Sequence, residues 1–460
     1  METKGTKEVK NPKTKKEKKD FRFPNEVPQL CRNERQGIRE LLVIGGGASG
    51  LLAAIFAARA GVQVSILEHK EQLGKKILST GNGRCNLGNR RMDETCYYAG
   101  EQEFPWKVFS RFGLAESEAF WQDLGLVLRD KNGYLYPWSE SAAVVTELLD
   151  REIEALGVEV RLGCHVTACV QEKARGLWRV KSEQGDFLAR RVILASGSKA
   201  ASVLGSDGSG YAIAESLGHQ VLPVLPALVQ LRCQGTFFKA WSGVRVQARV
   251  SLYWEAQLAA KDGGEVQLTD YGISGIPVFQ VSRFASRGLY EGKKVEVLLD
   301  FLAFLKPEEE KMWFKERLQS LEKQRANIFL AGFLQKKLAT VLLKSAGIVG
   351  ESRLCDLTEA QKNKLFLVLT AFRLTVLQTN SFEQAQICTG GVDVGEIDAA
   401  TMESKLASGL YLTGELLDVD GICGGYNLQW AFSSGAVAGK AAAASLKCRN
   451  EKANKLKNKQ

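Results

Sequence analysis

The chain has 460 residues, 45% of them hydrophobic, which is long enough for two or three domains that each bury a core. Its net charge of +10 is concentrated at the two ends. Residues 1–20 hold eight lysines against four acids, and residues 447–460 hold six basic residues against one acid. Such basic tails are more often disordered, solubilising ends than nucleic-acid arms, so composition alone does not favour a nucleic-acid partner.

The ten cysteines form no C-x-x-C pair and no metal-site spacing, and the chain has only three histidines. This pattern argues against structural zinc and against a disulfide framework, so we expect no metal site. No secretory signal is visible, because the first apolar run begins only at Leu41. Residues 41–58 are uncharged, but their glycines make a poor membrane span. We expect a cytoplasmic protein with no membrane partner.

The stretch Leu41–Gly50 (LLVIGGGASG) organises the chain. Its four apolar residues predict a buried parallel strand, and a G-x-G-x-x-G motif follows directly. Glycines at this spacing allow a tight turn, let a pyrophosphate approach the backbone, and let helix and strand pack closely. The pyrophosphate then lies on free N–H groups at a helix start. The predicted contacts are Gly45, Gly47, Ala48, Ser49 and Gly50.

A helix and a second strand complete a βαβ unit. Leu51–Ala60 is alanine-rich and stops at Gly61, and the strand Val62–Leu67 ends on Glu68. A carboxylate at this place can accept both hydroxyls of an adenosine ribose and would repel a 2′-phosphate. A glycine-rich turn in another kind of α/β protein is the alternative, but strand, helix, second strand and acid together favour a dinucleotide site.

A basic, glycine-rich loop, Leu73–Asn86 (LGKKILSTGNGRCN), follows the second strand. A solvated loop is one interpretation, and ligand contact through its glycines and cations is the other. The loop closely resembles the G-(R/K)-K-x-x-x-S-G-x-G-R-C-N stretch of a bacterial flavoprotein family, the BaiN-like NAD(P)/FAD-dependent oxidoreductases, also called aminoacetone-oxidase-family FAD enzymes. The resemblance spans about residues 40–445 and implies that the loop helps to hold FAD. The implied contacts are Lys75, Lys76, Ser79, Gly81, Asn82, Gly83, Arg84, Cys85 and Asn86, with His69 beside Glu68.

Three further segments resemble FAD-contacting parts of such flavoproteins, and the resemblance to FAD folds also implies that the backbone of Val166 meets the adenine. Val192–Ser198 (VILASGS) resembles their A-T-G strand end, with Ser196 in place of threonine. Gly409–Glu415 ends in Gly-Glu, where an acid meets ribityl hydroxyls. Gly424–Gln429 opens a small-residue helix whose N-terminus would face the flavin pyrimidine edge, and a plain packing helix is the alternative. The implied contacts are Val166, Ala195, Ser196, Gly197, Gly414, Glu415, Gly425, Tyr426, Asn427 and Leu428.

These observations predict an α/β fold, with a Rossmann-like, three-layer FAD-binding domain interrupted by a β-barrel plus helical insert. Residues 97–156 are expected to be largely helical, and alternating residues at 244–268 and 372–377 predict barrel strands. His219 is expected to be a surface or capping residue. We expect a disordered leader at 1–37, the FAD-binding domain at 38–202 and 385–446, the barrel-like domain at 203–300 and 345–384, a helical subdomain at 301–344, and a disordered tail at 447–460.

The first functional hypothesis is an FAD-dependent oxidoreductase that takes hydride from NAD(P)H and reduces a small organic acceptor. The resemblance includes reduction of unsaturated 3-oxo bile-acid intermediates, so an enone is one candidate. An amine oxidase that uses O₂, and an RNA-associated or non-catalytic flavoprotein, are the alternatives. Cys85 has no second cysteine nearby, which argues against a disulfide reductase. No proton donor is assigned. The cleft candidates, each of which could equally be structural, are Tyr271, Ser274, Arg283 and Tyr426.

Overall fold

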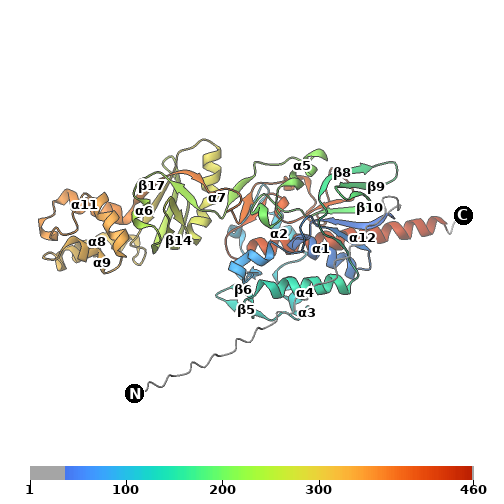
Figure 1. The fold of residues 1–460 in the computed structure, drawn as a ribbon, viewed down its shortest axis with the longest axis horizontal. Coiled ribbons are helices and arrows are strands. Elements are labelled where there is room, and N and C mark those ends of the chain that lie inside the picture. Colours follow the sequence, from blue (N-terminus) through green and yellow to red (C-terminus); the bar gives the residue numbers. More distant parts are fainter. Residues whose placement is uncertain (1–36, 458–460) are drawn as a thin grey trace, which may run out of the picture. The chain divides into compact units, whose positions relative to one another are not determined.

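The computed structural model describes residues 37–457, so the leader predicted at 1–37 lies outside the described residues apart from Gly37. The described chain opens with the predicted βαβ unit, because four consecutive apolar residues suit a strand that is buried on both faces. Its elements are β1 (Arg39–Ile44), α1 (Ala48–Arg59) and β2 (Val64–Leu67). β1 lies parallel to β2 on one side and to β10 (Gly185–Leu194) on the other (Figure 1).

A seven-stranded sheet extends this unit in the order β7-β2-β1-β10-β9-β8, with β19 also paired to β10. The first half of β10 is antiparallel to β9, and its second half is parallel to both β1 and β19. Strands β8, β9 and β10 thus form an antiparallel meander, and a strand from the far end of the sequence joins the same sheet. The further bounds are β7 (Glu159–Arg161), β8 (Val166–Glu172), β9 (Leu177–Ser182) and β19 (Leu410–Leu412).

The last helix, α12 (Tyr426–Lys457), lies along α1 (Figure 1). Two of its glycines permit this contact, because a Cβ on Gly435 would lie 2.1 Å from the Ser49 carbonyl oxygen and one on Gly439 would lie 2.2 Å from that of Ala53. The helix continues through residues 447–457, so the disordered tail predicted there is wrong for those residues. No glycine or proline stands between residues 440 and 457 to end it.

Residues 97–156 are only partly helical. Helices α2 and α3 and helix α4 fit the prediction, but a β-hairpin, β5–β6, separates α3 from α4. Its turn is Asn132-Gly133, and both residues have positive φ values of 57° and 93°, which suit a tight hairpin turn. The bounds are β3 (Gly88–Asn89), β4 (Tyr97–Ala99), α2 (Phe104–Phe109), α3 (Leu114–Asp123), β5 (Leu128–Lys131), β6 (Tyr134–Pro137) and α4 (Ala142–Ala155).

The insert contains a closed barrel in the order β12-β15-β14-β13-β16-β17, which confirms the predicted architecture (Figure 1). Its interior is a hydrophobic core separate from the core around β1 and α1. Helix α7 packs on β14, β13 and β17. The bounds are β12 (Leu231–Cys233), α6 (Phe238–Trp241), β13 (Arg245–Trp254), β14 (Gln257–Leu268), β15 (Gly272–Ser274), α7 (Ile276–Tyr290), β16 (Val295–Asp300) and β17 (Phe372–Thr379).

The helical part of the insert runs further than the predicted limit of residue 344. Helix α11 occupies a range that was predicted for the barrel, because Thr358 and Gln361 form a capping box that starts it. Its apolar face, with Leu365 and Leu369, is buried in the barrel core. The bounds are α8 (Pro307–Ser320), α9 (Ala326–Ala331), α10 (Lys336–Ser345) and α11 (Glu359–Thr370).

Two details near the start of the insert differ from expectation. Helix α5 (Ser209–Ser216) packs into the core around β1, although its residues were predicted to belong to the barrel. His219 is buried rather than at the surface, with Nδ1 2.8 Å from Glu396 Oε2 and Nε2 2.8 Å from Ser404 Oγ. The imidazole thus ties two loops together. Among the described helices, none is long and apolar enough to cross a membrane.

Candidate functional site

A cavity of about 530 Å³ lies where β1, β2 and β10 end and where α1 and α12 begin. Its walls come from segments far apart in the sequence, including the loop after β2, the segment after β10, the start of α7, and the residues that open α12. Every predicted cofactor contact lines this cavity except Gly50, Gly83, Cys85, Gly414 and Tyr426. The parallel-sheet topology explains the convergence, because ligands bind beyond the carboxyl ends of the strands in such sheets.

The start of α1 forms a cradle for an anion. Gly47 is the N-cap residue, no side chain caps it, and the first turn holds no acid. A Cβ on Gly45 would lie 2.4 Å from the Ala195 carbonyl oxygen, and one on Gly50 would lie 1.9 Å from that of Gly45. By contrast, a Cβ on Gly47 would meet no protein atom within 4 Å. The outer glycines therefore pack the turn, and Gly47 leaves open space at the helix start, which suits a pyrophosphate.

Glu68 follows β2 and faces the same cavity, with 8% of the residue exposed. Its Oε2 accepts a hydrogen bond from the Gly46 N–H at 2.7 Å, and its Oε1 accepts one from the Lys70 N–H at 2.8 Å. The carboxylate is thus held by two backbone groups, with acceptor capacity left for a ligand hydroxyl. His69, His165 and Val166 line the same end of the cavity.

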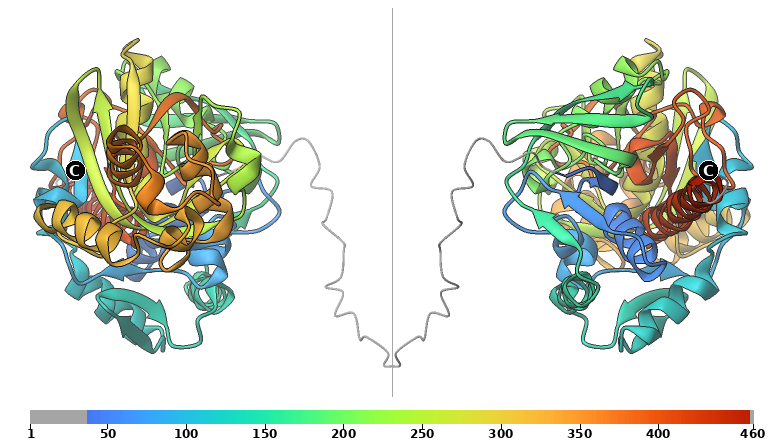
Figure 2. Two further views of the ribbon diagram at one scale, coloured as in Figure 1. Left: turned by 90° about the vertical axis from the view of Figure 1, so that its left-hand side faces the viewer. Right: turned by 90° about the vertical axis from the view of Figure 1, so that its right-hand side faces the viewer.

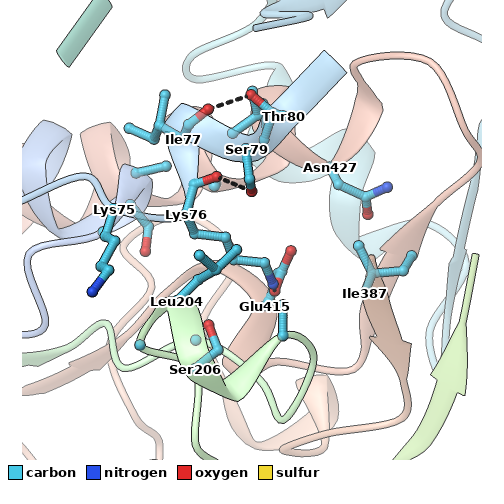
Figure 3. Close-up of a pocket in the computed structure, with 18 of the residues that line it drawn as sticks. Lys75, Lys76, Ile77, Ser79, Thr80, Leu204, Ser206, Ile387, Glu415 and Asn427 are labelled. Carbon is cyan, nitrogen blue, oxygen red and sulfur yellow. Dashed lines mark hydrogen bonds and ion pairs between the residues drawn. The ribbon is translucent and has the colours of Figure 1, made fainter. Parts of the chain in front are cut away.

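A second acid, Glu415, lies near the middle of the cavity (Figure 3). Lys76 Nζ is 2.6 Å from Glu415 Oε2, and Ser198 Oγ donates to the same oxygen at 3.0 Å. Gly414 lies behind it and is held by hydrogen bonds with Ser434 and Trp430. This arrangement explains why Gly414 positions the acid without itself lining the cavity.

Two polar side-chain atoms of the cavity wall are buried without a hydrogen-bond partner among the described residues, namely Asn86 Oδ1 and Ser196 Oγ. Leaving such an atom unpaired costs about 1–3 kcal/mol, so a polar ligand is expected to satisfy them. A Cβ on Gly425 would lie 2.6 Å from Asn86 Oδ1, which keeps the backbone at the start of α12 against this atom. The anion cradle, the two acids and the unpaired atoms together fit FAD.

The loop after β2 ends in an unusual backbone, with positive φ at Gly81, Asn82, Gly83 and Cys85. This curvature places Arg84 at the cavity wall, with its guanidinium carbon 5.8 Å from the centre of the Tyr136 ring. Cys85 points into the core instead, and burial raises the pKa of its thiol to about 12. The side chain is therefore a packed thiol and not a cavity group.

The insert and the segment that follows it supply one wall that was not identified from the sequence. Its apolar members are Leu228, Ile276, Phe279 and Ile387, and Cys423 lies beside them. β11 (Leu225–Ala227) pairs with β18 (Ile387–Thr389) to place two of these residues. One signal was available, because the glycine-rich turn Thr269–Gly275 leads directly to Ile276 at the start of α7. Asp207 also lines the cavity and accepts a hydrogen bond from the Ser209 N–H.

None of the four suggested cleft residues lines the cavity. Arg283 pairs with Asp420 at 2.8 Å, and its guanidinium lies 3.7 Å from the Tyr98 ring centre. Tyr271 accepts a hydrogen bond from Asn380, while Ser274 is buried in β15 and Tyr426 is buried in the core. The geometry therefore supports a structural role for all four residues. Within residues 37–457, no three His, Cys, Asp or Glu side chains are grouped to hold a metal ion.

Comparison with known proteins places this site in a family. Residues 39–441 match the family described as "HI0933-like protein Rossmann domain". The 3-dehydro-bile acid delta(4,6)-reductase of Clostridium scindens is 48% identical over 403 residues, covering 87% of this chain and 98% of that protein. Ribosomal RNA dihydrouridine synthases of Haemophilus influenzae and Escherichia coli are 30% and 27% identical, each covering 86% of this chain and 96% of the relative.

Among solved structures, 3-ketosteroid-delta4-(5alpha)-dehydrogenase from Rhodococcus jostii aligns with a TM-score of 0.46 and 15% identity, covering 89% of this chain and 97% of that one. The family match covers most of the chain and includes every segment that builds the cavity. The chain therefore belongs to the HI0933-like Rossmann-domain family, and it is an FAD-dependent oxidoreductase.

Proposed function

We propose that the protein reduces a carbon–carbon double bond conjugated to a carbonyl, using hydride that NAD(P)H delivers through FAD. The observation that carries this proposal is the apolar wall that the insert holds against the cavity, formed by Leu228, Ile276, Phe279 and Ile387. An enone with an apolar body would bury that body against the wall. Gln386 lies beside it and offers an amide for the carbonyl.

The same proposal assigns the cofactor contacts. The N–H groups at the start of α1 hold the pyrophosphate, Glu68 holds the adenosine ribose, and Glu415 holds the ribityl chain. The opening residues of α12, Asn427 and Leu428, line the cavity and would meet the pyrimidine edge of the flavin, where the helix dipole favours negative charge. FAD, when bound, supplies the hydride chemistry, and these residues supply its position and electrostatics.

The printed activities of the relatives support this reaction class. One is named for reducing delta(4,6) double bonds of a 3-dehydro bile acid, and others are named for making dihydrouridine in ribosomal RNA. Both are reductions of a double bond conjugated to a carbonyl, since the uracil C5–C6 bond is conjugated to C4=O. A uracil ring in RNA is therefore a second candidate acceptor.

The nine cysteines in the described part of the chain are free thiols, which supports a reducing, cytoplasmic setting.

The test supplies the FAD-loaded protein anaerobically with NADH or NADPH and a 3-oxo-4-ene steroid. We expect oxidation of the nicotinamide and a product that has gained two hydrogen atoms. Phe279→Ala should raise KM for the steroid more than it lowers kcat, because the wall contacts the apolar body rather than the reacting bond. Phe304→Ala, an exposed phenylalanine outside the cavity lining, is the matched control. Turnover only with an amine and O₂ would instead establish the oxidase alternative.

A further inference from the structure

The β5–β6 hairpin carries a row of aromatic side chains on one face. Tyr134, Tyr136 and Trp138 alternate with Leu135 and Pro137, which are buried. Alternate residues of a strand project to opposite sides, so the three aromatic rings share the side away from the core. Trp138 is 65% exposed and Tyr134 is 37% exposed, and no function described above uses Trp138.

Basic side chains share this face. In the antiparallel pairing, Arg129 stands opposite Tyr136 and Lys131 stands opposite Tyr134, and directly opposite residues lie on the same side of a sheet. The Arg129 guanidinium lies 5.7 Å from the centre of the Trp138 ring. Arg84 reaches the face from the neighbouring loop and lies over Tyr136.

One carboxylate balances part of this charge. Glu140 lies 3.0 Å from Arg129 and 3.9 Å from Arg84. Three cations against one acid leave the face positively charged, while the body of the chain is nearly neutral. We call Arg84, Arg129, Lys131, Tyr134, Tyr136 and Trp138 the aromatic–basic face.

This face is continuous with the cavity. Tyr134, Tyr136 and Arg84 line the cavity wall, together with Gly424 and Asn427 from the start of α12. A Cβ on Gly424 would lie 2.9 Å from the Tyr134 ring, so the backbone there is close to the first aromatic of the row. Figure 2 shows the hairpin, in teal, at the edge of the molecule beside α3 and α4. The face therefore runs from the cavity wall outward to an exposed tryptophan.

We infer that the aromatic–basic face binds a single-stranded RNA segment, whose bases stack on the row while its phosphates meet the cations. A row of aromatic rings on an open sheet beside basic residues is the arrangement by which proteins hold unpaired nucleotides. An apolar steroid would need no cations, and the adenine of one nicotinamide nucleotide would need only one ring. The inference rests on the second candidate acceptor above, because a stacked strand would present a neighbouring uracil to the cavity.

The test measures the affinity of the FAD-loaded, full-length protein for a labelled oligouridine by fluorescence anisotropy. Trp138→Ala is expected to weaken binding about 5- to 150-fold, which is the effect of removing the ring under one stacked base. Arg129→Ala with Lys131→Ala is expected to flatten the dependence of log K on log salt by about 0.7 for each phosphate that the variant no longer neutralises. The matched control is Tyr290→Ala with Lys311→Ala, since Tyr290 is 60% exposed and lies on the insert.

Two results would overturn the inference: the wild-type protein does not bind the oligouridine, or the face variants bind it as tightly as wild type. If variants of the second kind also raise KM for NAD(P)H, the face belongs to the donor nucleotide. Reduction of the steroid enone by the wild-type protein is measured in parallel. If the wild-type protein does not reduce the steroid enone but binds the oligouridine, the result counts against the proposed function and not against RNA binding by the face.

Discussion

Single glycines in the first turn have different tasks, although they belong to one motif. Gly50 lies against the backbone of Gly45, and Gly45 lies against the backbone of Ala195, so both are needed for packing. Gly47 touches no protein atom at its Cβ position and has a φ of −80°, which any residue can adopt. Its requirement for glycine therefore comes from the ligand and not from the fold.

Gly47→Ala and Gly50→Ala should therefore have different effects. The Gly47 variant should unfold in urea like wild type when FAD is absent, but should bind FAD at least tenfold more weakly, because its methyl group occupies the pyrophosphate space. The Gly50 variant should lose about 1–3 kcal/mol of stability from overpacking. Equal FAD affinity in the Gly47 variant and wild type would refute the anion cradle.

A second residue-scale prediction concerns Glu159, on the edge strand β7. Burial acts to raise the pKa of this carboxyl, but hydrogen bonds from Arg39, Ser65 and Arg161 outweigh burial and lower it to about 2. Because the folded-state pKa lies below the ordinary value of 4.5, the carboxylate stabilises the fold fully above that pH and loses its effect as the pH falls toward 2.

Glu159→Gln should therefore destabilise the protein at neutral pH by about 1–2 kcal/mol, a figure reduced for the partial exposure of the side chain. The difference from wild type in urea unfolding should narrow as the pH is lowered from about 5 to about 3. Glu147→Gln, which removes an exposed pair with Arg151, is the control and should change stability by less than about 0.5 kcal/mol. A stability difference between Glu159→Gln and wild type that does not change with pH would contradict the lowered pKa of Glu159.

The sequence identified cavity-lining residues well where they lie within one short motif. Glu68 and the glycines before it could be predicted from their spacing along the chain alone. Leu228 and Ile387 were missed because pairing between β11 and β18 brings them together, and that pairing joins segments about 160 residues apart. His219 was misjudged because Glu396 and Ser404, which make its burial tolerable, come from a distant loop.

At the scale of elements, the contact between α1 and α12 positions the cavity, because both helices begin there. Gly435 and Gly439 allow the α12 backbone to touch that of α1. The sequence indicated a small-residue helix but not its partner, since small residues suit many packing surfaces. It also missed the β5–β6 hairpin, where the Asn132-Gly133 turn signal was present and the surrounding helices were weighted more heavily.

Gly435→Ala tests this contact, because the contact and helix propensity predict opposite changes in the melting temperature. Alanine favours a helix over glycine by about 1 kcal/mol, so propensity alone predicts a higher melting temperature. The added methyl group would lie 2.1 Å from the Ser49 carbonyl oxygen, so we expect a lower melting temperature and weaker FAD binding. Calorimetry of the FAD-free and FAD-loaded protein measures both. A stabilised variant would show that the helices are not in this close contact.

At the scale of the whole described chain, the two hydrophobic cores must keep a fixed orientation toward each other for the insert to form a cavity wall. Arg283 on α7 provides one joint, through Asp420 on β20 (Val419–Gly421), Thr389 and the ring of Tyr98. Asp420 is only 2% exposed, so its charge depends on this partner. The sequence predicted the interrupted domain and the barrel from element order, but not this joint.

Arg283→Ala should destabilise the protein by about 3–5 kcal/mol, because it leaves the Asp420 carboxylate buried without a partner. The double variant Arg283→Met with Asp420→Asn should recover a large part of the loss, since both charges are then absent. Urea unfolding of the single and double variants measures the coupling. Additive losses in the double variant would show that the pair does not act as a joint.

The most direct test of the central claim is the visible spectrum of the purified protein, recorded anaerobically while NADH or NADPH is added. The account predicts a flavin band, restored by added FAD if purification has removed the cofactor, that bleaches when one of the two nucleotides is added. A protein that shows no flavin band even with added FAD, or a band that neither nucleotide bleaches, would contradict it.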